Sequence, residues 1–407
     1  MASAIKEYFQ VLTGNVSVEL PMLADLSSRA TDLAALGDQL KSILRDGAGN
    51  GALQTILSGE AAPIDQINEQ LPASLIDGLL EFDLAKTDGS VLRPLFQAKE
   101  LGGNIFFSDR LLSMRLVRRT EAKDLYVDPF WEGPAIASIL PKRKVANALD
   151  MGCGCGVLAL TMARYAERVF AVDLNPRALM ITQLNAALNN IDNVEIRESN
   201  LFAALDQLQF DQIAFNAPVA LENKARNLQE SGEEILRLFF QQIHGHLTDN
   251  GDAIVNSCVK DWENNKFLDR LRSWLGDQAH QYQPMYLEQW VLDDGLRFEA
   301  RKAQSRLLDP KDYGALKAIR KGLICLRKTS GMHALDVPTS YHDWTEALGV
   351  NTSGAITEWA FNTRPGAIGV DELDNVDLLQ RLAPDERAVA KRALCDIIER
   401  GRRIEWP

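Results

Sequence analysis

The stretch "LDMGCGCGVLAL", residues 149–160, places three glycines at alternate positions between apolar segments. It allows two interpretations: a thiol site built on Cys153 and Cys155, or a glycine loop that lies against a ligand. Two cysteines cannot complete a tetrahedral metal site, and the sequence has neither a second cysteine pair nor a histidine cluster nearby. Glycine lacks a β-carbon, so the backbone can turn tightly and approach a bulky group. We therefore predict a ligand-binding loop without a metal.

From about residue 145 onward, short apolar segments alternate with amphipathic ones. This alternation predicts a parallel sheet covered on both faces by helices, an α/β doubly wound, Rossmann-like sheet of seven strands. The predicted helices include 157–166 and 176–190, and a helical insert is predicted around 309–320. The predicted strands are 145–151, 168–174, 194–200, 212–218, 251–259, 280–292 and 321–328.

An acidic residue follows the loop at the distance expected for a nucleoside site. Asp173 ends the second strand about twenty residues after the loop, where a carboxylate can accept both hydroxyls of a ribose. Ligands of open α/β sheets lie beyond the carboxyl ends of the strands. The two elements together indicate adenosine. The glycines follow G-x-G-x-G, whereas a dinucleotide site usually shows G-x-G-x-x-G.

On these motifs, the chain over about residues 125–260 resembles the class I S-adenosylmethionine-dependent methyltransferases. The resemblance implies S-adenosylmethionine as cofactor. Asp150, Gly152 and Gly154, with Cys153 between the glycines, are expected to line its methionine moiety. Asp173 is expected to hold the ribose and Leu174 to flank the adenine.

The segments "ESNLF" and "FNAPVA", residues 198–202 and 215–220, resemble the small-domain branch of that family. That branch carries Asn-Pro-Pro and an aromatic residue, and it methylates glutamine side chains or RNA bases. This chain has Asn216, Ala217, Pro218 and Val219 instead. Asn216 is the expected catalytic residue, because its side-chain oxygen can orient a nitrogen toward the methyl group, and it is also expected at the cofactor. Valine cannot stack on a flat group, so a base or an amide is the less expected acceptor.

Asn200 and Leu201 stand where the branch contacts the adenine, although Asn200 also suits a turn. Upstream, "DLYVDPFWE", residues 124–132, contains Tyr126 and Asp128 as further catalytic candidates on a cofactor or substrate wall. The alternative interpretation of this segment is a helix start, where acids favour the dipole and aromatics pack on the sheet.

The sequence divides into three predicted regions. Residues 1–115 indicate a helical, winged-helix-like domain, built from a helix and a hairpin over 91–109. Residues 116–330 carry the methyltransferase domain, and residues 331–407 are a helical extension. Without a secretory leader or an apolar run long enough for the membrane, we expect a cytoplasmic protein with no membrane partner.

The acidic composition favours a small-molecule substrate. A formal net charge of −12 disfavours a phosphate-binding surface, so we do not expect nucleic acid as a partner. We expect methyl transfer to an N or O acceptor on a small molecule. The alternatives are a protein (glutamine) or RNA methyltransferase, or a cyclase that releases methylthioadenosine from the cofactor. No motif indicates an oligomeric state.

Overall fold

The structure is a computed structural model. It describes residues 26, 28–47, 50–110, 127, 132–133, 136–137, 140–218, 231–292, 316–329 and 339–340. These residues fall into two compact units. The described residues of the first lie within Met1–Pro134, Gly152–Arg164 and Arg168–Asn200, and those of the second lie within Ala135–Met151, Tyr165–Glu167 and Leu201–Pro407. Among the helices within the described ranges, none is long and apolar enough to cross a membrane.

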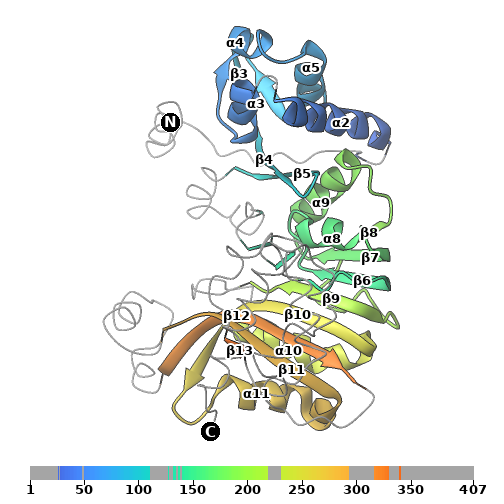
Figure 1. Cartoon of the computed structure of the whole chain (residues 1–407), viewed down its shortest axis with the longest axis vertical. Helices are drawn as coiled ribbons and strands as arrows, with labels where there is room; N and C mark the ends of the chain where they lie inside the picture. Colours follow the sequence, from blue (N-terminus) through green and yellow to red (C-terminus); the bar gives the residue numbers. More distant parts are fainter. Residues whose placement is uncertain are drawn as a thin grey trace, which may run out of the picture. The chain divides into compact units, whose positions relative to one another are not determined.

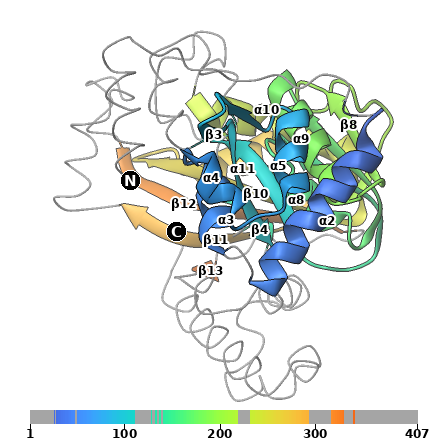
Figure 2. The same cartoon turned by 90° about the horizontal axis from the view of Figure 1, so that it is seen from above.

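The first unit contains a small three-stranded sheet with the connectivity of a winged helix. The elements follow one another as α3 (Asn50–Leu57), β1 (Ala62–Pro63), α4 (Ile64–Asn68), α5 (Ala73–Glu81), β2 (Ala85–Thr87) and β3 (Val91–Pro94). The strands are antiparallel in the order β1-β3-β2. Figures 1 and 2 show these helices gathered around β3. The exposed acids of α4 and α5 include Asp65, Asp77 and Glu81.

The wing lies earlier in the chain than the sequence predicted. Strands β2 and β3 are joined by a turn in which the Asp88 carboxylate accepts hydrogen bonds from the Ser90 and Val91 amides. The hairpin predicted over 91–109 is present, as β4 (Phe96–Leu101) paired with β5 (Asn104–Asp109), but it is separate from the three-stranded sheet. Only its first part differs from the prediction, because Val91–Pro94 form β3, which pairs with β2.

The β4–β5 hairpin packs on helix α9 (Pro176–Leu188), and every residue of β5 is buried. Figure 1 shows β5 beside this helix. Helix α2 (Ala30–Asp46) reaches the end of α9, where a β-carbon on Gly37 would lie 1.8 Å from the Leu188 carbonyl oxygen. Only glycine permits that approach.

The first unit also holds a β-α-β segment of β7 (Ala166–Asp173) from Arg168 onward, α9 and β8 (Val194–Glu198), whose strands are parallel. Helix α8 (Val157–Met162), which follows the glycine loop, is shorter than the predicted helix over 157–166. The chain leaves the helix early because the Tyr165 carbonyl accepts the Val145 amide, and Ala166 already begins β7.

The second unit holds β6 (Val145–Met151), β9 (Phe210–Asn216), β10 (Leu247–Trp262), β11 (Tyr282–Leu292), β12 (Leu316–Lys328) and β13 (Thr339–Ser340). Their order is β13-β11-β12-β10-β9-β6. β6, β9 and β10 are parallel, and α10 (Ser231–His246) connects β9 to β10. Figure 1 shows β9, β10, β12 and β11 side by side. Helix α11 (Phe267–Leu275) follows β10 in the chain. These features confirm the predicted α/β class.

The later part of the chain was predicted to contain a helical insert and a helical extension. The predicted helix around 309–320 is wrong over Leu316–Arg320, which belongs to β12. The reason is that β12 lies between β10 and β11 and its backbone pairs with both. Apart from the two residues of β13, the predicted helical extension over 331–407 lies outside the described residues.

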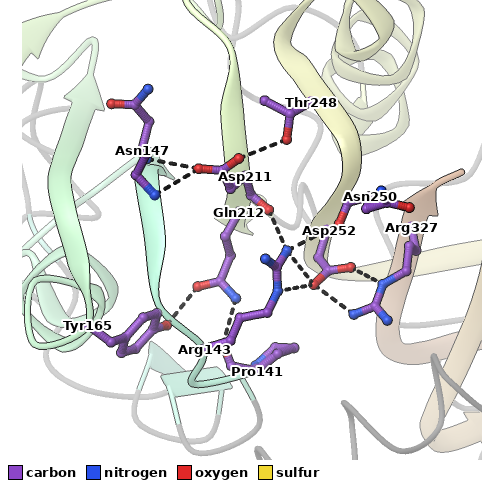
Figure 3. A network of polar contacts seen from close by, with 11 residues as sticks. Pro141, Arg143, Asn147, Tyr165, Asp211, Gln212, Thr248, Asn250, Asp252 and Arg327 are labelled. Atoms are coloured by element: carbon purple, nitrogen blue, oxygen red, sulfur yellow. Dashed lines mark hydrogen bonds and ion pairs between the residues drawn. The ribbon is translucent and has the colours of Figure 1, made fainter. Parts of the chain in front are cut away.

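The amino ends of β9 and β10 are tied together by a buried charge network in the second unit (Figure 3). The fully buried Asp252 pairs with Arg327 through Nη2 at 2.9 Å and with Arg143 at 3.2 Å. Arg143 also donates to the carbonyl oxygens of Asp211 and Asn250. These groups join β9, β10 and β12 at the edge of the sheet opposite the carboxyl ends of the parallel strands.

Removing Asp252 is expected to leave two arginines without their carboxylate. We predict that Asp252→Ala lowers the free energy of unfolding by about 3–5 kcal/mol, the range for breaking a buried pair. The matched control is Glu195→Ala, which removes the half-exposed partner of Arg197 and should cost at most about 1 kcal/mol. Equal urea midpoints for the two variants would contradict the structural role of the network.

Candidate functional site

The glycine loop in the first unit adopts a backbone conformation that favours glycine. The φ angles of Gly152, Gly154 and Gly156 are 67°, 56° and 79°, all in the left-handed region. A β-carbon on Gly156 would also lie 2.9 Å from Cγ2 of Thr182. The spacing of the glycines therefore follows from backbone conformation, and at Gly156 from packing as well.

The backbone of this loop is hydrogen-bonded on both sides. The Cys153 amide donates to the Val172 carbonyl on β7 at 2.9 Å. On the other side, Thr182 Oγ1 donates to the Gly154 carbonyl at 3.1 Å and Asn185 Nδ2 to the Cys155 carbonyl at 2.8 Å. Helix α9 thus holds two consecutive loop carbonyls.

Asp173 lies at the end of β7 and binds the same loop. Its Oδ2 accepts the Gly154 amide at 3.1 Å, and its Oδ1 accepts the Asn175 amide at 2.9 Å. Burial raises the pKa of Asp173 above that of an ordinary aspartate, and these backbone hydrogen bonds oppose the shift. The carboxylate is therefore fixed beside the loop. Next to it, Leu174 is 49% exposed, an unusual exposure for a large apolar side chain.

The two cysteines of the loop are buried, and Thr182 Oγ1 lies 3.4 Å from Cys153 Sγ. Across the described part of the chain, no group of three His, Cys, Asp or Glu side chains is arranged to hold a metal ion. The geometry gives Cys153 and Cys155 a packing role.

In the second unit, polar residues lie at or near the carboxyl ends of three parallel strands. Asp150 on β6 is 1% exposed, and β6 pairs in register with β9, which ends at Asn216. Asn216 is in turn the register partner of Asn256 on β10. Three polar side chains therefore occupy one edge of the sheet.

Asn256 is a residue that the sequence reasoning missed. Its Nδ2 donates to Oδ1 of Asn216 at 2.8 Å, and its carbonyl accepts the Ala217 amide at 3.1 Å. The side chain is nearly buried, at 4% exposure. The available signal was a lone asparagine inside the apolar strand "AIVNSCV". Asn256 fixes how the Asn216 carboxamide is turned.

The remaining predicted site residues fall in several places. Asn200 is exposed just after β8, and Leu201 has a φ of 50°, unusual for a bulky residue. Their contact with adenine stays a prediction. Tyr126 and Asp128 lie outside the described residues, but Val127 between them is described and its amide donates to Asp109 Oδ2 at 2.8 Å.

One part of the chain is similar to known proteins. Residues 134–267 match the family model described as "Methyltransferase small domain". The chain carries a class I S-adenosylmethionine-dependent methyltransferase domain. It is 31% identical over 166 residues to a release factor glutamine methyltransferase of Koribacter versatilis, covering 34% of this chain and 59% of that protein.

Two further relatives match the same domain. A ribosomal protein L11 methyltransferase of Lactobacillus johnsonii is 27% identical, covering 33% of this chain and 42% of the relative. A putative protein N5-glutamine methyltransferase of Methanocaldococcus jannaschii is 28% identical, covering 33% of this chain and 76% of the relative. The chain spans about half the length of the first two relatives.

These relatives overturn the expected partners. The expected small-molecule substrate is wrong, because these relatives are named as methyltransferases of proteins. The exclusion of nucleic acid is wrong as well. The similar solved structures include a tRNA m1G37 methyltransferase of M. jannaschii, with 12% identity and a TM-score of 0.34 over 59% of this chain and 60% of that one. The physical reason is that a net charge of −12 is a sum over the whole chain. It does not define the charge of the surface that meets the substrate.

Two glycines separate the effect of backbone conformation from that of packing. Gly156 and Gly89 both have positive φ, but only Gly156 has atoms within 3 Å of a β-carbon position. Alanine at either site should cost about 1–2 kcal/mol for the left-handed conformation. At Gly156 overpacking against Thr182 should add about 1–3 kcal/mol. Urea unfolding measures both, and equal losses would show that the loop does not pack closely on α9.

Proposed function

We propose that this chain is an S-adenosylmethionine-dependent methyltransferase that methylates a side-chain nitrogen of a protein. The observation that carries the cofactor assignment is the Asp173 carboxylate, fixed to the Gly154 amide at the end of β7. The protein substrate is supported by the relatives named for a release factor and for ribosomal protein L11.

The residues present fit the cofactor. A loop of left-handed glycines leaves room beside the backbone, and Asp173 supplies a carboxylate for the ribose hydroxyls. Exposed Leu174 offers an apolar surface to the adenine. Within the first unit, we assign Gly152, Cys153 and Gly154 to the methionine end and Asn200 to the adenine.

The bound cofactor supplies an electrophilic methyl group on a good leaving group. The protein then has to align the acceptor nitrogen and exclude water. A carboxamide oxygen has two lone pairs, and Asn256 occupies one at Asn216. The second can accept an N–H of the substrate, which turns the nitrogen lone pair toward the methyl group. Val219 in place of an aromatic residue removes the requirement that the acceptor be planar.

The substrate class is tested by following the methyl group. With tritiated cofactor and an extract of cells that lack the enzyme, label should enter acid-precipitable material and be released by protease. RNase-sensitive label would establish the RNA alternative, and label confined to the soluble fraction would contradict a macromolecular substrate. Release of methylthioadenosine from cofactor and protein alone would establish the cyclase alternative.

Replacement of Asp173 tests the cofactor site directly. Loss of charge-assisted hydrogen bonds, about 1.5–3 kcal/mol each, should weaken binding of S-adenosylhomocysteine at least about tenfold in Asp173→Ala. Calorimetry provides the affinity, and the exposed Asp192→Ala is the matched control. Near-normal affinity in Asp173→Ala would contradict the assignment.

The pH dependence of binding gives an independent measure. The ionised carboxylate accepts the ribose hydroxyls, and burial raises the pKa of Asp173. Affinity for S-adenosylhomocysteine should therefore fall as the pH decreases, and the fall should begin at a higher pH than the pKa of an ordinary aspartate, about 3.9, would give. The Asp173→Asn variant should bind S-adenosylhomocysteine more weakly and should lose this pH dependence. An unchanged pH profile in the Asn variant would assign the titration to another group.

A further inference from the structure

Helix α9 carries buried polar side chains that face two different partners. Arg177, Thr182 and Asn185 are fully buried, and Asn189 just beyond the helix is 8% exposed. Buried polar groups are costly unless hydrogen-bonded, and each of these is bonded to the glycine loop, to the β4–β5 hairpin or to both. All of them lie within the first unit.

The asparagines complete the backbone hydrogen bonding of β5. Asn189 accepts the Ile105 amide at 2.8 Å and donates to the Ile105 carbonyl at 2.7 Å. Asn185 does the same at Phe107, at 2.7 and 2.9 Å. The two carboxamides, four residues apart on α9, replace the backbone of a neighbouring strand for alternate residues of β5.

Asn185 differs from Asn189 because its Nδ2 also donates to the Cys155 carbonyl of the glycine loop. One carboxamide thus holds both the hairpin and the loop. Thr182, one turn earlier, holds the loop alone through the Gly154 carbonyl. The bonds of Asn189 go to Ile105 and to the Asn185 carbonyl of its own helix turn.

A second connection runs from the end of the hairpin. The Asp109 carboxylate is buried against Arg177, with Nε at 3.0 and 3.1 Å from its two oxygens. The same carboxylate accepts the Val127 amide. A β-carbon on Gly154 would lie 3.9 Å from Val127 Cγ1, so this residue borders the loop.

We propose that Asn185 is a positioning residue for the cofactor and that it couples the N-terminal hairpin to the glycine loop. The inference rests on the proposed cofactor site and extends it to residues 104–109, which belong to the region expected to be a separate domain. Cofactor at the loop then stabilises the hairpin through the shared carboxamide. By thermodynamic reciprocity, a docked hairpin strengthens cofactor binding.

Three variants separate the contacts of α9 with the glycine loop from its contacts with the hairpin. Thr182→Val removes loop contacts only, and Asn185→Ala removes contacts with both the loop and the hairpin. Asn189→Ala removes hairpin contacts and one bond within α9, but no loop contact. Calorimetry with S-adenosylhomocysteine should show affinity about tenfold lower for Asn185→Ala and Thr182→Val, the loss of roughly one hydrogen bond to the loop. Asn189→Ala should fall within about threefold of wild type.

Hydrogen exchange at the Ile105 and Phe107 amides tests the coupling, because a purely structural role of Asn185 would not make this exchange depend on S-adenosylhomocysteine. Saturating S-adenosylhomocysteine should slow exchange at Ile105 in the wild type and in Thr182→Val, but not in Asn185→Ala. Unchanged exchange in the ligand-bound wild type, or normal affinity in Asn185→Ala, would overturn the coupling. If Asn185→Ala does not fold, the wild-type exchange result and the Thr182→Val affinity decide. Absence of binding to the wild type would instead overturn the proposed function.

Discussion

The backbone of the glycine loop is the constraint on which the rest of the first unit depends. With three residues in the left-handed region, the loop cannot continue a strand or a helix, so its polar groups need partners from elsewhere. β7 supplies the Val172 carbonyl and Asp173 supplies a carboxylate, while α9 supplies a hydroxyl and a carboxamide. Each partner fixes one peptide group.

That requirement explains why α9 is buried with polar residues on it. A helix covering a parallel sheet usually keeps one face in water. Here a second layer of β5 and α2 covers α9, and Asn185, Asn189 and Arg177 make this burial tolerable by bonding to the hairpin. Residues 104–109 therefore contribute an interior contact to α9 within the first unit.

In the second unit, the two edges of the parallel strands have different roles. Asp252 and its arginines hold the strands together at their amino ends. Asp150, Asn216 and Asn256 lie at the carboxyl ends, where ligands of such sheets bind. The charged groups that stabilise the sheet and the polar groups proposed for the site therefore lie at opposite ends of the same strands.

Local sequence signals predicted much of this arrangement. The glycine spacing, the strand ends at Asp173 and Asn216, and the strands themselves follow from periodicity and backbone chemistry. The carboxamides of Asn185 and Asn256 were not predicted, because their partners lie 30 and 40 residues away and no local pattern identifies them. The helix predicted over Leu316–Arg320 was wrong for the same reason, because pairing with two distant strands overrode a helical pattern.

The most direct test of the account is an experimental structure with S-adenosylhomocysteine bound. Both ribose hydroxyls are expected to donate to the Asp173 carboxylate at about 2.5–2.7 Å, the range of charge-assisted O–H···O bonds. The homocysteine end is expected to lie against the glycine loop. A ligand bound elsewhere, or a ribose held by other groups with Asp173 facing only the Gly154 and Asn175 amides, would contradict it.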